Sequence, residues 1–384
     1  NVISKRYTKY MQSETKNCQN CKKKFSIDEN ELSFYKKMQV PTPKICPECR
    51  FKMRAMWRNE ISLYNRKCAK TSTPIISVYN PKLPYLVVSH EYYESDSWDA
   101  KEYGIDFDFK KPFFDQFNEL LLKVPKAPTF LSTGDGPNIN SMYSNYAGGL
   151  KNCYFVFNSG PAEETMYSRG HRKAYNVVDG YFGTEVENMY ECVNSQKSSN
   201  IYFGKDVVSS IDCMFVTNLN NCNKCFCCVN LRNASYHIFN QPVSKEEYES
   251  RVNEVMGSYE RIERMKKEFY HFEKKFPVKE THNIRSVNST GDYLTECKNV
   301  RNSFEVVKGE NSYYLFSSKE IKDSIGTIGY GFRSERLLEC VSTGYSSNII
   351  AGSVITNCRD VMYSYFLRNC HDCIGCDSLK NSEY

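Results

Sequence analysis

A duplicated module with an inner period of 12 residues restricts the fold of this 384-residue chain more than any other feature. Residues 190–236 align with residues 338–384 at a constant offset of 148 without gaps, and 18 of the 47 positions are identical. The matched phrases include Glu191-Cys192-Val193 with Glu339-Cys340-Val341. Self-similarity of this kind indicates a repeat architecture, in which copies of one unit stack on each other.

Polar residues mark the inner period. The first module has Asn152, Asn176, Asn188, Asn200 and Asp212 on one grid of 12, and the second has Ser312, Ser324, Arg336, Asn348, Asp360 and Asp372. Asn and Asp tolerate left-handed backbone conformations, which suits corners, and the β-branched, aromatic and Cys side chains between them suit strands. We therefore expect two tandem β-solenoids, with a coil of either 12 or 24 residues.

The predicted fold class is mainly β, with a zinc ribbon before the two β-solenoid modules and a helical insertion between them. The expected segments are a zinc ribbon with a basic helix (1–70), a linker that caps the first coil (71–140), module 1 (141–241), the insertion (242–280) and module 2 (281–384). The capping box Ser244-Lys-Glu-Glu247 predicts where the insertion becomes helical, and Pro277 where it ends. Tyr384 matches Tyr236 inside module 1, so we expect the natural chain to continue.

Two C-x2-C pairs near the amino terminus predict a metal site. Cys18, Cys21, Cys46 and Cys49 offer the four thiolates of a structural Zn²⁺. Disulfides are the alternative, but the amino terminus has no signal-peptide pattern, which favours a reducing compartment. We expect a cytoplasmic protein, or a virion component if the source is viral.

A second metal site is a further hypothesis. Its candidate ligands are Cys222, Cys225, Cys228, Cys370, Cys373 and Cys376. Their C-x2-C-x2-C spacing resembles part of a ferredoxin motif, although no Cys-Pro follows. The alternative is that these small thiols fill a narrow core.

Positive charge is concentrated at the amino terminus. Residues 1–70 hold 17 Lys and Arg against 6 Asp and Glu, while the remaining residues hold 34 against 39. Arg50, Arg54 and Arg58 recur at helical spacing. Together with Lys52, Trp57 and Arg66 they form a candidate contact surface for nucleic acid or a protein partner. The alternative is a solvated helix on which Trp57 packs against the ribbon.

Catalytic and membrane signals are absent from the sequence. Its six His residues form no metal-protease motif, and no nucleophile elbow or phosphate-binding glycine loop is present. No apolar run reaches the roughly 18 residues of a membrane-spanning helix. We expect neither an enzyme, nor a small-molecule substrate, nor a membrane protein.

Several phrases carry a resemblance to a known family. They are Phe34-Tyr35-Lys36-Lys37-Met38-x-Val40-Pro41, Cys46-Pro47-x-Cys49-Arg50, Trp57-Arg58-Asn59-Glu60 and Cys228-Val-Asn-Leu-Arg-Asn233. They resemble an uncharacterised family of zinc-ribbon proteins with Cys- and Asn-rich repeats from candidate-phylum bacteria and giant viruses, often named CaiB/BaiF transferases. The resemblance implies a fold and a metal but no activity. A CoA-transferase needs a nucleophilic carboxylate in a Rossmann-like domain, and the sequence has no such pattern.

The sequence thus predicts a non-enzymatic zinc-binding scaffold with a basic ribbon and rigid β-solenoids, which binds protein partners or assembles with itself. One alternative is a protein that binds nucleic acid, for example ribosomal RNA. Another is a structural component of a virion or large assembly.

Overall fold

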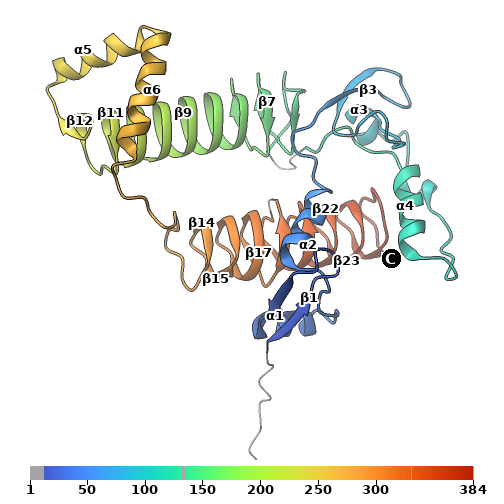
Figure 1. The fold of residues 1–384 in the computed structure, drawn as a ribbon. Helices are drawn as coiled ribbons and strands as arrows, with labels where there is room; N and C mark the ends of the chain where they lie inside the picture. Colours follow the sequence, from blue (N-terminus) through green and yellow to red (C-terminus); the bar gives the residue numbers. More distant parts are fainter. Residues whose placement is uncertain (1–12, 132–134, 330, 384) are drawn as a thin grey trace, which may run out of the picture.

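Parallel strands twelve residues apart build most of the computed structural model, which describes residues 13–131, 135–329 and 331–383. Ile211 pairs with Ser199 on one side and with Asn223 on the other, so one coil takes 12 residues rather than 24. The coils form two stacks that lie side by side (Figure 1). The prediction of a mainly β chain is confirmed.

The first stack comprises β5 to β13 and the second comprises β14 to β25. Strands of the first stack are β5 (Ser144–Asn145), β6 (Leu150–Lys151), β7 (Tyr154–Phe157), β8 (Ala162–Glu163), β9 (Met166–Val208), β10 (Ile211–Asn220), β11 (Asn223–Val229), β12 (Ser235–Ile238) and β13 (Gln241–Pro242). Strands of the second are β14 (Gly291–Thr295), β15 (Lys298–Arg301), β16 (Ser303–Val307), β17 (Glu310–Lys319), β18 (Ile321–Lys322), β19 (Ile325–Ile328), β20 (Ser334–Val341), β21 (Ser347–Ile350), β22 (Ser353–Thr356), β23 (Arg359–Met362), β24 (Tyr365–Arg368) and β25 (His371–Ile374).

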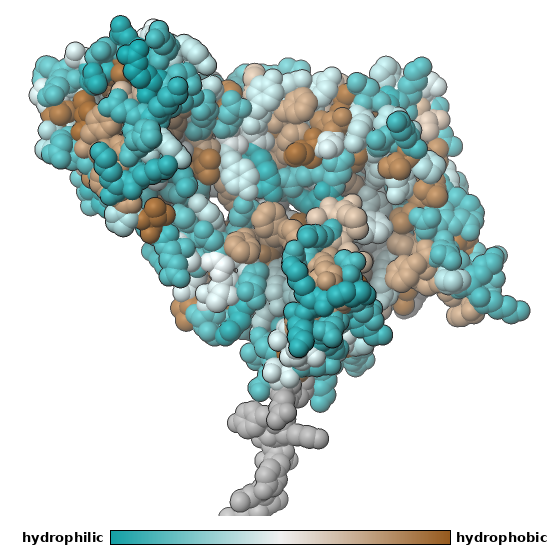
Figure 2. Space-filling model, viewed as in Figure 1, coloured by the Kyte–Doolittle hydropathy of each residue, from teal (hydrophilic) through white to brown (hydrophobic). Residues whose placement is uncertain are grey.

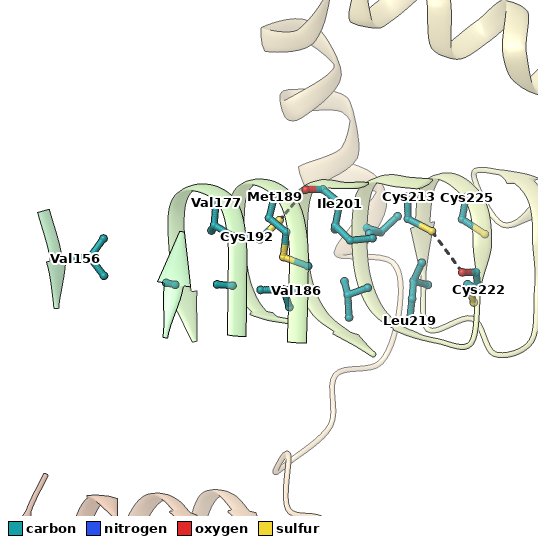
Figure 3. Close-up of a cluster of buried hydrophobic side chains, with 14 of the residues drawn as sticks. Val156, Val177, Val186, Met189, Cys192, Ile201, Cys213, Leu219, Cys222 and Cys225 are labelled. Atoms are coloured by element: carbon teal, nitrogen blue, oxygen red, sulfur yellow. Dashed lines mark hydrogen bonds between the residues drawn. The ribbon is translucent and has the colours of Figure 1, made fainter. Parts of the chain in front are cut away.

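Each coil has four sides of three residues. Buried positions in β9 recur at every third residue, and the residue before most of them has a φ near +50°. Figure 3 shows the resulting inward rows, one of which is Val177, Met189, Ile201, Cys213 and Cys225. Left-handed residues other than glycine are strained, by about 1–3 kcal/mol each in general. This strain is offset by the hydrogen bonds between parallel strands and by the apolar core, in which each coil aligns its inward side chains with those of the next coil.

Asparagine ladders hold several corners. The Asn176 side-chain amide donates to Asn188 at 2.8 Å, Asn188 donates to Asn200 at 2.9 Å, and Asn200 donates to Asp212 at 2.7 Å. All four have positive φ, as the grid predicted for corners. In the first stack the 12-residue grid therefore marks corners, as expected.

The same grid is wrong for part of the second stack. Ser312 and Ser324 are fully buried, and the corners stand one residue earlier at Asn311 and Asp323. The reason is a 13-residue coil, in which Ile325 pairs with Leu338. The predicted grid counts back from Asn348 in steps of 12 and does not allow for this extra residue. Before the 13-residue coil it therefore falls on inward positions instead of corners.

The helical insertion contains α5 (Lys245–Met256) and α6 (Tyr259–Glu273). Ser244 caps α5 by accepting a hydrogen bond from the Glu247 amide at 3.1 Å. Val255, Met265 and Phe269 pack with Phe215 and Phe226, and so cover a flank of the first stack. The apolar face of the insertion is therefore used within the chain.

The segment between the ribbon and the first stack contacts both stacks. It contains β3 (Tyr64–Lys67), β4 (Pro74–Ser77), α3 (His90–Glu94), the short 3-10 helix η1 (Ala100–Tyr103) and α4 (Phe113–Lys123). Its core includes Tyr365 and Phe366, and Lys126 forms a buried ion pair with Asp377. It also contacts the first stack, where the Phe130 and Tyr146 rings stack with centroids 4.8 Å apart and Leu131 pairs with Ala147. The expected boundary at residue 70 falls inside the β3–β4 hairpin.

Candidate metal centre

An antiparallel hairpin and a helix start build the ribbon (residues 14–58). The hairpin consists of β1 (Glu14–Asn17) and β2 (Lys24–Ile27), joined by a turn in which Lys22 has a φ of 63°. Cys18 and Cys21 lie in this turn. Helix α1 (Glu29–Lys37) follows, capped by Asp28. Cys46 is the N-cap of α2 (Pro47–Ala55), with Pro47 as its first residue, which places Cys49 one turn into the helix.

The four Cys sulfurs converge on one point. Their ligand atoms all lie within 4.8 Å of one another, and the Cys21 and Cys46 sulfurs are 3.7 Å apart. An ion bonded tetrahedrally to sulfurs at about 2.3 Å requires sulfurs about 3.8 Å apart. Over residues 13–131, 135–329 and 331–383, no other group of three or more Cys, His, Asp or Glu converges in this way. The predicted ligand set therefore fits a metal ion.

Hydrogen-bond donors surround the sulfurs. The Cys46 amide donates to the Cys18 sulfur at 3.2 Å, and the Asn20 side-chain amide donates to the Cys49 sulfur at 3.3 Å. Burial raises the pKa of Cys18, but hydrogen bonds from the backbone of Cys46, Cys21 and Asn20 outweigh it and lower that pKa to about 6. Donors of this kind favour the thiolate that a metal needs and fix its orientation.

The arginines of α2 do not form an exposed cationic face, which corrects that expectation. Arg50 and Arg54 are 8% and 4% exposed, and both pair with the carboxylate of Glu339 on the second stack. Arg50 also donates to the Tyr35 hydroxyl at 3.0 Å. Because a buried charge is costly unless it is paired, these guanidinium groups serve to dock the ribbon.

Arg58 extends the docking to the first stack. Its guanidinium pairs with Glu60 at 3.0 Å, donates to the Asn158 side chain at 2.7 Å and also donates to the Ser342 hydroxyl. It lies over the Tyr146 ring, 3.8 Å from the centroid. Asn158 belongs to the first stack and Ser342 to the second, so one side chain bonds to both.

The other predicted contact residues have separate surroundings. Lys52 is exposed and pairs with Glu48 at 3.0 Å, one helical turn away. Trp57 is 49% exposed, with its ring 6.2 Å from that of Tyr365. Arg66 donates to the backbone carbonyls of Asn80 and Tyr85, both at 3.1 Å. The structure therefore does not assemble the six residues into one surface.

The second predicted metal site is not assembled among the described residues. Cys222, Cys225 and Cys228 point into the first stack, and Cys370 and Cys373 into the second, with Cys376 packed against it. Their thiols donate to backbone carbonyls, as Cys222 does to Asn220 at 3.5 Å. A hydrogen bond with the neighbouring Cys225, together with burial, raises the pKa of Cys222 far above its usual value, which opposes metal binding at that thiol. The core-filling alternative accounts for these residues.

Sequence patterns did not identify the glutamate of the second stack that binds the arginines of the ribbon. Glu339 stands in the duplicated phrase Glu-Cys-Val, and its counterpart Glu191 pairs with Lys266 of α6 at 3.0 Å. Each stack thus uses the same outward glutamate to hold an added helix, α2 on the second and α6 on the first. The recurrence of this outward Glu in both modules was the signal in the sequence that could have identified the docking position.

Comparisons with known proteins identify no family for this chain. No family model matches the chain, and no curated protein matches it. One similar solved structure is described as a "putative acetyltransferase from Desulfovibrio desulfuricans G20", at 11% identity over 62% of this chain and 66% of that chain, slightly less than two thirds of its length. Its TM-score is 0.14, too low to support an inference about fold or activity. Among the residues that the structure describes, no helix has the length and apolar character needed to cross a membrane.

Proposed function

We propose that this protein is a non-enzymatic scaffold in which a zinc-bound ribbon locks two β-solenoids into one rigid body. The observation that carries the proposal is that α2 and the residues after it bond to both stacks. Arg54 pairs with Glu339 of the second stack, and Glu60 pairs with Arg169 of the first. A metal that fixes the start of α2 therefore adds to the direct bonds between the stacks, such as that of the Tyr181 hydroxyl to Glu305.

The donor set supports zinc as the metal. Four thiolates in a tetrahedron favour zinc or an iron–sulfur cluster, whereas calcium and magnesium require oxygen ligands. Two C-x2-C knuckles on a ribbon are typical of structural zinc sites with no open position. The closed set also supports a structural role, because all four positions are taken by protein.

The outer faces support a role in binding partners. The first stack exposes a row of large side chains, among them Tyr154, Met166 and Tyr190. Aromatic residues and Met are enriched in protein interfaces. A β-solenoid presents such residues at regular spacing on a rigid surface, which suits a protein partner or a second copy of this chain.

Removal of the metal tests the scaffold. Small-angle X-ray scattering of the full chain should show a larger radius of gyration after treatment with a chelator, because the ribbon unfolds and the stacks lose the bonds that it adds between them. The far-UV circular dichroism of the stacks should persist, and added Zn²⁺ should restore the original scattering curve. Unchanged scattering after complete metal removal would contradict the proposal.

A second candidate is nucleic-acid binding, which an exposed run of cations favours. Lys22, Lys23 and Lys24 are all exposed beside the first knuckle, and Lys44 and Lys52 are exposed on the same ribbon. Figure 2 shows mainly hydrophilic side chains over the ribbon in front of the second stack. Lysines in this arrangement suit the phosphates of RNA, ribosomal RNA included, or of DNA.

Fluorescence anisotropy of labelled single-stranded RNA and duplex DNA, titrated in salt, tests this candidate. Replacing Lys22, Lys23 and Lys24 by Gln should weaken binding and reduce the salt slope by about 2–3, since each phosphate contact contributes about 0.7–0.9. The matched control replaces Lys101, Lys110 and Lys111, which are exposed in the segment after the ribbon, and should leave the slope unchanged. No binding at low salt would eliminate the candidate.

A further inference from the structure

The β3–β4 hairpin repeats the β1–β2 hairpin of the ribbon. Glu14 pairs with Ile27 in the first, and Tyr64 pairs with Ser77 in the second, an offset of 50 residues. The last pairs, Asn17 with Lys24 and Lys67 with Pro74, keep that offset. The two hairpins have the same length, register and loop length.

The turns of the two hairpins have matching hydrogen bonds. The Cys18 amide donates to the Lys23 carbonyl at 2.9 Å, and the Cys68 amide donates to the Thr73 carbonyl at 2.8 Å. Lys22 donates to the Cys18 carbonyl at 3.0 Å, and Ser72 donates to the Cys68 carbonyl at 2.9 Å. Lys22 and Ser72 both have left-handed backbones, with φ of 63° and 60°. The loop after Cys68 is thus a complete metal-knuckle turn.

The helix starts match as well, at an offset of 43. The Cys46 amide donates to the Cys18 sulfur at 3.2 Å, and the Ser89 amide donates to the Cys68 sulfur at 3.2 Å. Cys46 is the N-cap of α2, and Ser89 is the N-cap of α3. The backbone bond from Arg50 to Cys46 at 3.0 Å has its counterpart from Tyr93 to Ser89 at 2.9 Å. Both halves of the ribbon therefore have counterparts.

We propose that residues 64–94 are a second copy of the ribbon that has lost its metal and is held instead by hydrogen bonds and aromatic packing. The four ligand positions Cys18, Cys21, Cys46 and Cys49 correspond to Cys68, Thr71, Ser89 and Tyr92. One thiol, two hydroxyls and a phenol do not form a zinc site.

Local bonds replace the metal in the second copy. The Ser89 hydroxyl accepts from the Tyr92 amide at 3.2 Å, which caps α3, while the Cys68 sulfur accepts from the Ser89 amide. Burial raises the pKa of Cys68, yet hydrogen bonds from Thr71, Lys70 and Ser89 lower it to about 7. Those residues correspond to Cys21, Asn20 and Cys46, the donors around Cys18. The electrostatic surroundings of a ligand sulfur have thus been retained.

The two copies also dock alike on the second stack. Arg50 in the first copy pairs with Glu339, and Tyr93 at the corresponding helix position packs on Phe366, with ring centroids 5.3 Å apart. The first contact is ionic and the second apolar. The second copy therefore has a packed core with the stack, which explains why it dispenses with a metal.

Restoring the ligands tests the proposal. The variant Thr71→Cys/Ser89→Cys/Tyr92→Cys of the full chain is titrated with Co²⁺ under reducing conditions, and tetrahedral thiolate-bound cobalt is counted from its absorption. We expect two ions per chain, against one in the unmodified protein. Adding Cys68→Ser to the variant should abolish the second four-thiolate site. A folded triple variant that binds one ion, or an unmodified chain that binds two, would overturn the proposal.

Hydrogen exchange of the unmodified chain decides the matter if the triple variant does not fold. After chelation, the amides of Gln19, Lys22 and Arg50 should lose protection, because the metal holds them. The matched amides of Ala69, Ser72 and Tyr93 should stay protected. Loss of protection in both sets, or its absence from the second set before chelation, contradicts a metal-free ribbon held by hydrogen bonds.

Discussion

Arg54 and Glu339 form a buried ion pair across 285 residues of sequence, between the helix that starts at Cys46 and the second stack. The Arg54 side chain is 5% exposed and that of Glu339 is 23% exposed. Arg50 shares the same carboxylate. One carboxylate of the second stack thus binds two guanidinium groups of the ribbon.

Replacing Glu339 by Gln should weaken the docking of the ribbon on the second stack. The change leaves two buried guanidinium groups without a counter-charge, and breaking a buried pair in this way costs about 3 kcal/mol or more. Urea denaturation should show the loss, together with faster hydrogen exchange in α2. Glu335→Gln is the matched control, because Glu335 is 41% exposed and pairs with its neighbour Arg336. Equal effects of the two substitutions would contradict the docking role.

Replacing Cys49 by Ser should remove the metal and unfold the ribbon alone. Binding energy at a structural thiolate site is folding energy, of about 10–16 kcal/mol for small zinc domains. Metal content per chain should fall to near zero, and residues 14–58 should become sensitive to protease while the stacks resist. Cys68→Ser, the matched control, should leave the metal content unchanged. Loss of metal from the control would show that the four ligands are misassigned.

Stability should fall in acid through Glu60. Burial raises its pKa, but the guanidinium groups of Arg58 and Arg169 outweigh that and hold the pKa below its usual value of 4.5. A depressed folded-state pKa means that the contribution is complete above about pH 4.5 and is lost as the pH falls through the lower folded value. Urea unfolding from pH 7 to pH 3 should show this loss. In Glu60→Gln the stability at pH 7 should already be lower and its decline in acid smaller; an unchanged decline would exclude Glu60 as its source.

The asparagine ladder predicts a graded series at Asn188. Asn188→Gly loses the side-chain bonds to Asn176 and Asn200 but keeps a left-handed backbone at no steric cost. Asn188→Ala loses both, so we expect it to cost about 1 kcal/mol more than the Gly variant. Thermal unfolding of the two variants measures the difference. If Ala were the milder substitution, backbone strain would not govern these corners.

The amino-acid sequence predicted the 12-residue period and the four Cys residues that converge, because both are local patterns. Asn188 and Asn200 recur at corners, and the C-x2-C pairs bring sulfurs together within a single turn. The three-residue sides were not predicted, because the inward positions hold residues as different as Gly, Ser, Cys, Met and Ile. No hydrophobic period of three therefore marks them in the sequence. The burial of Arg54 was not predicted either. Helical spacing places arginines on one face, but only the position of Glu339 decides whether that face meets solvent.

The second copy of the ribbon was not predicted from the sequence, for a related reason. Between Cys18–Cys49 and Cys68–Tyr92 only one of the four ligand positions keeps its residue type. What the two copies share is backbone hydrogen bonding, which many sequences satisfy. A fold without its metal leaves no spacing motif to detect.

The three-residue sides determine how such a chain changes length. Whole coils of 12 residues can be added or removed while every remaining side chain keeps its direction, and each addition lengthens the stack by about 4.8 Å. An insertion of one residue within a side would turn the following core outward. The chain accommodates its one extra residue between Ile325 and Leu338 in the stretch that holds Gly329 and Gly331. The length of a stack can thus change in fixed steps of one coil, independently of the ribbon that docks on it.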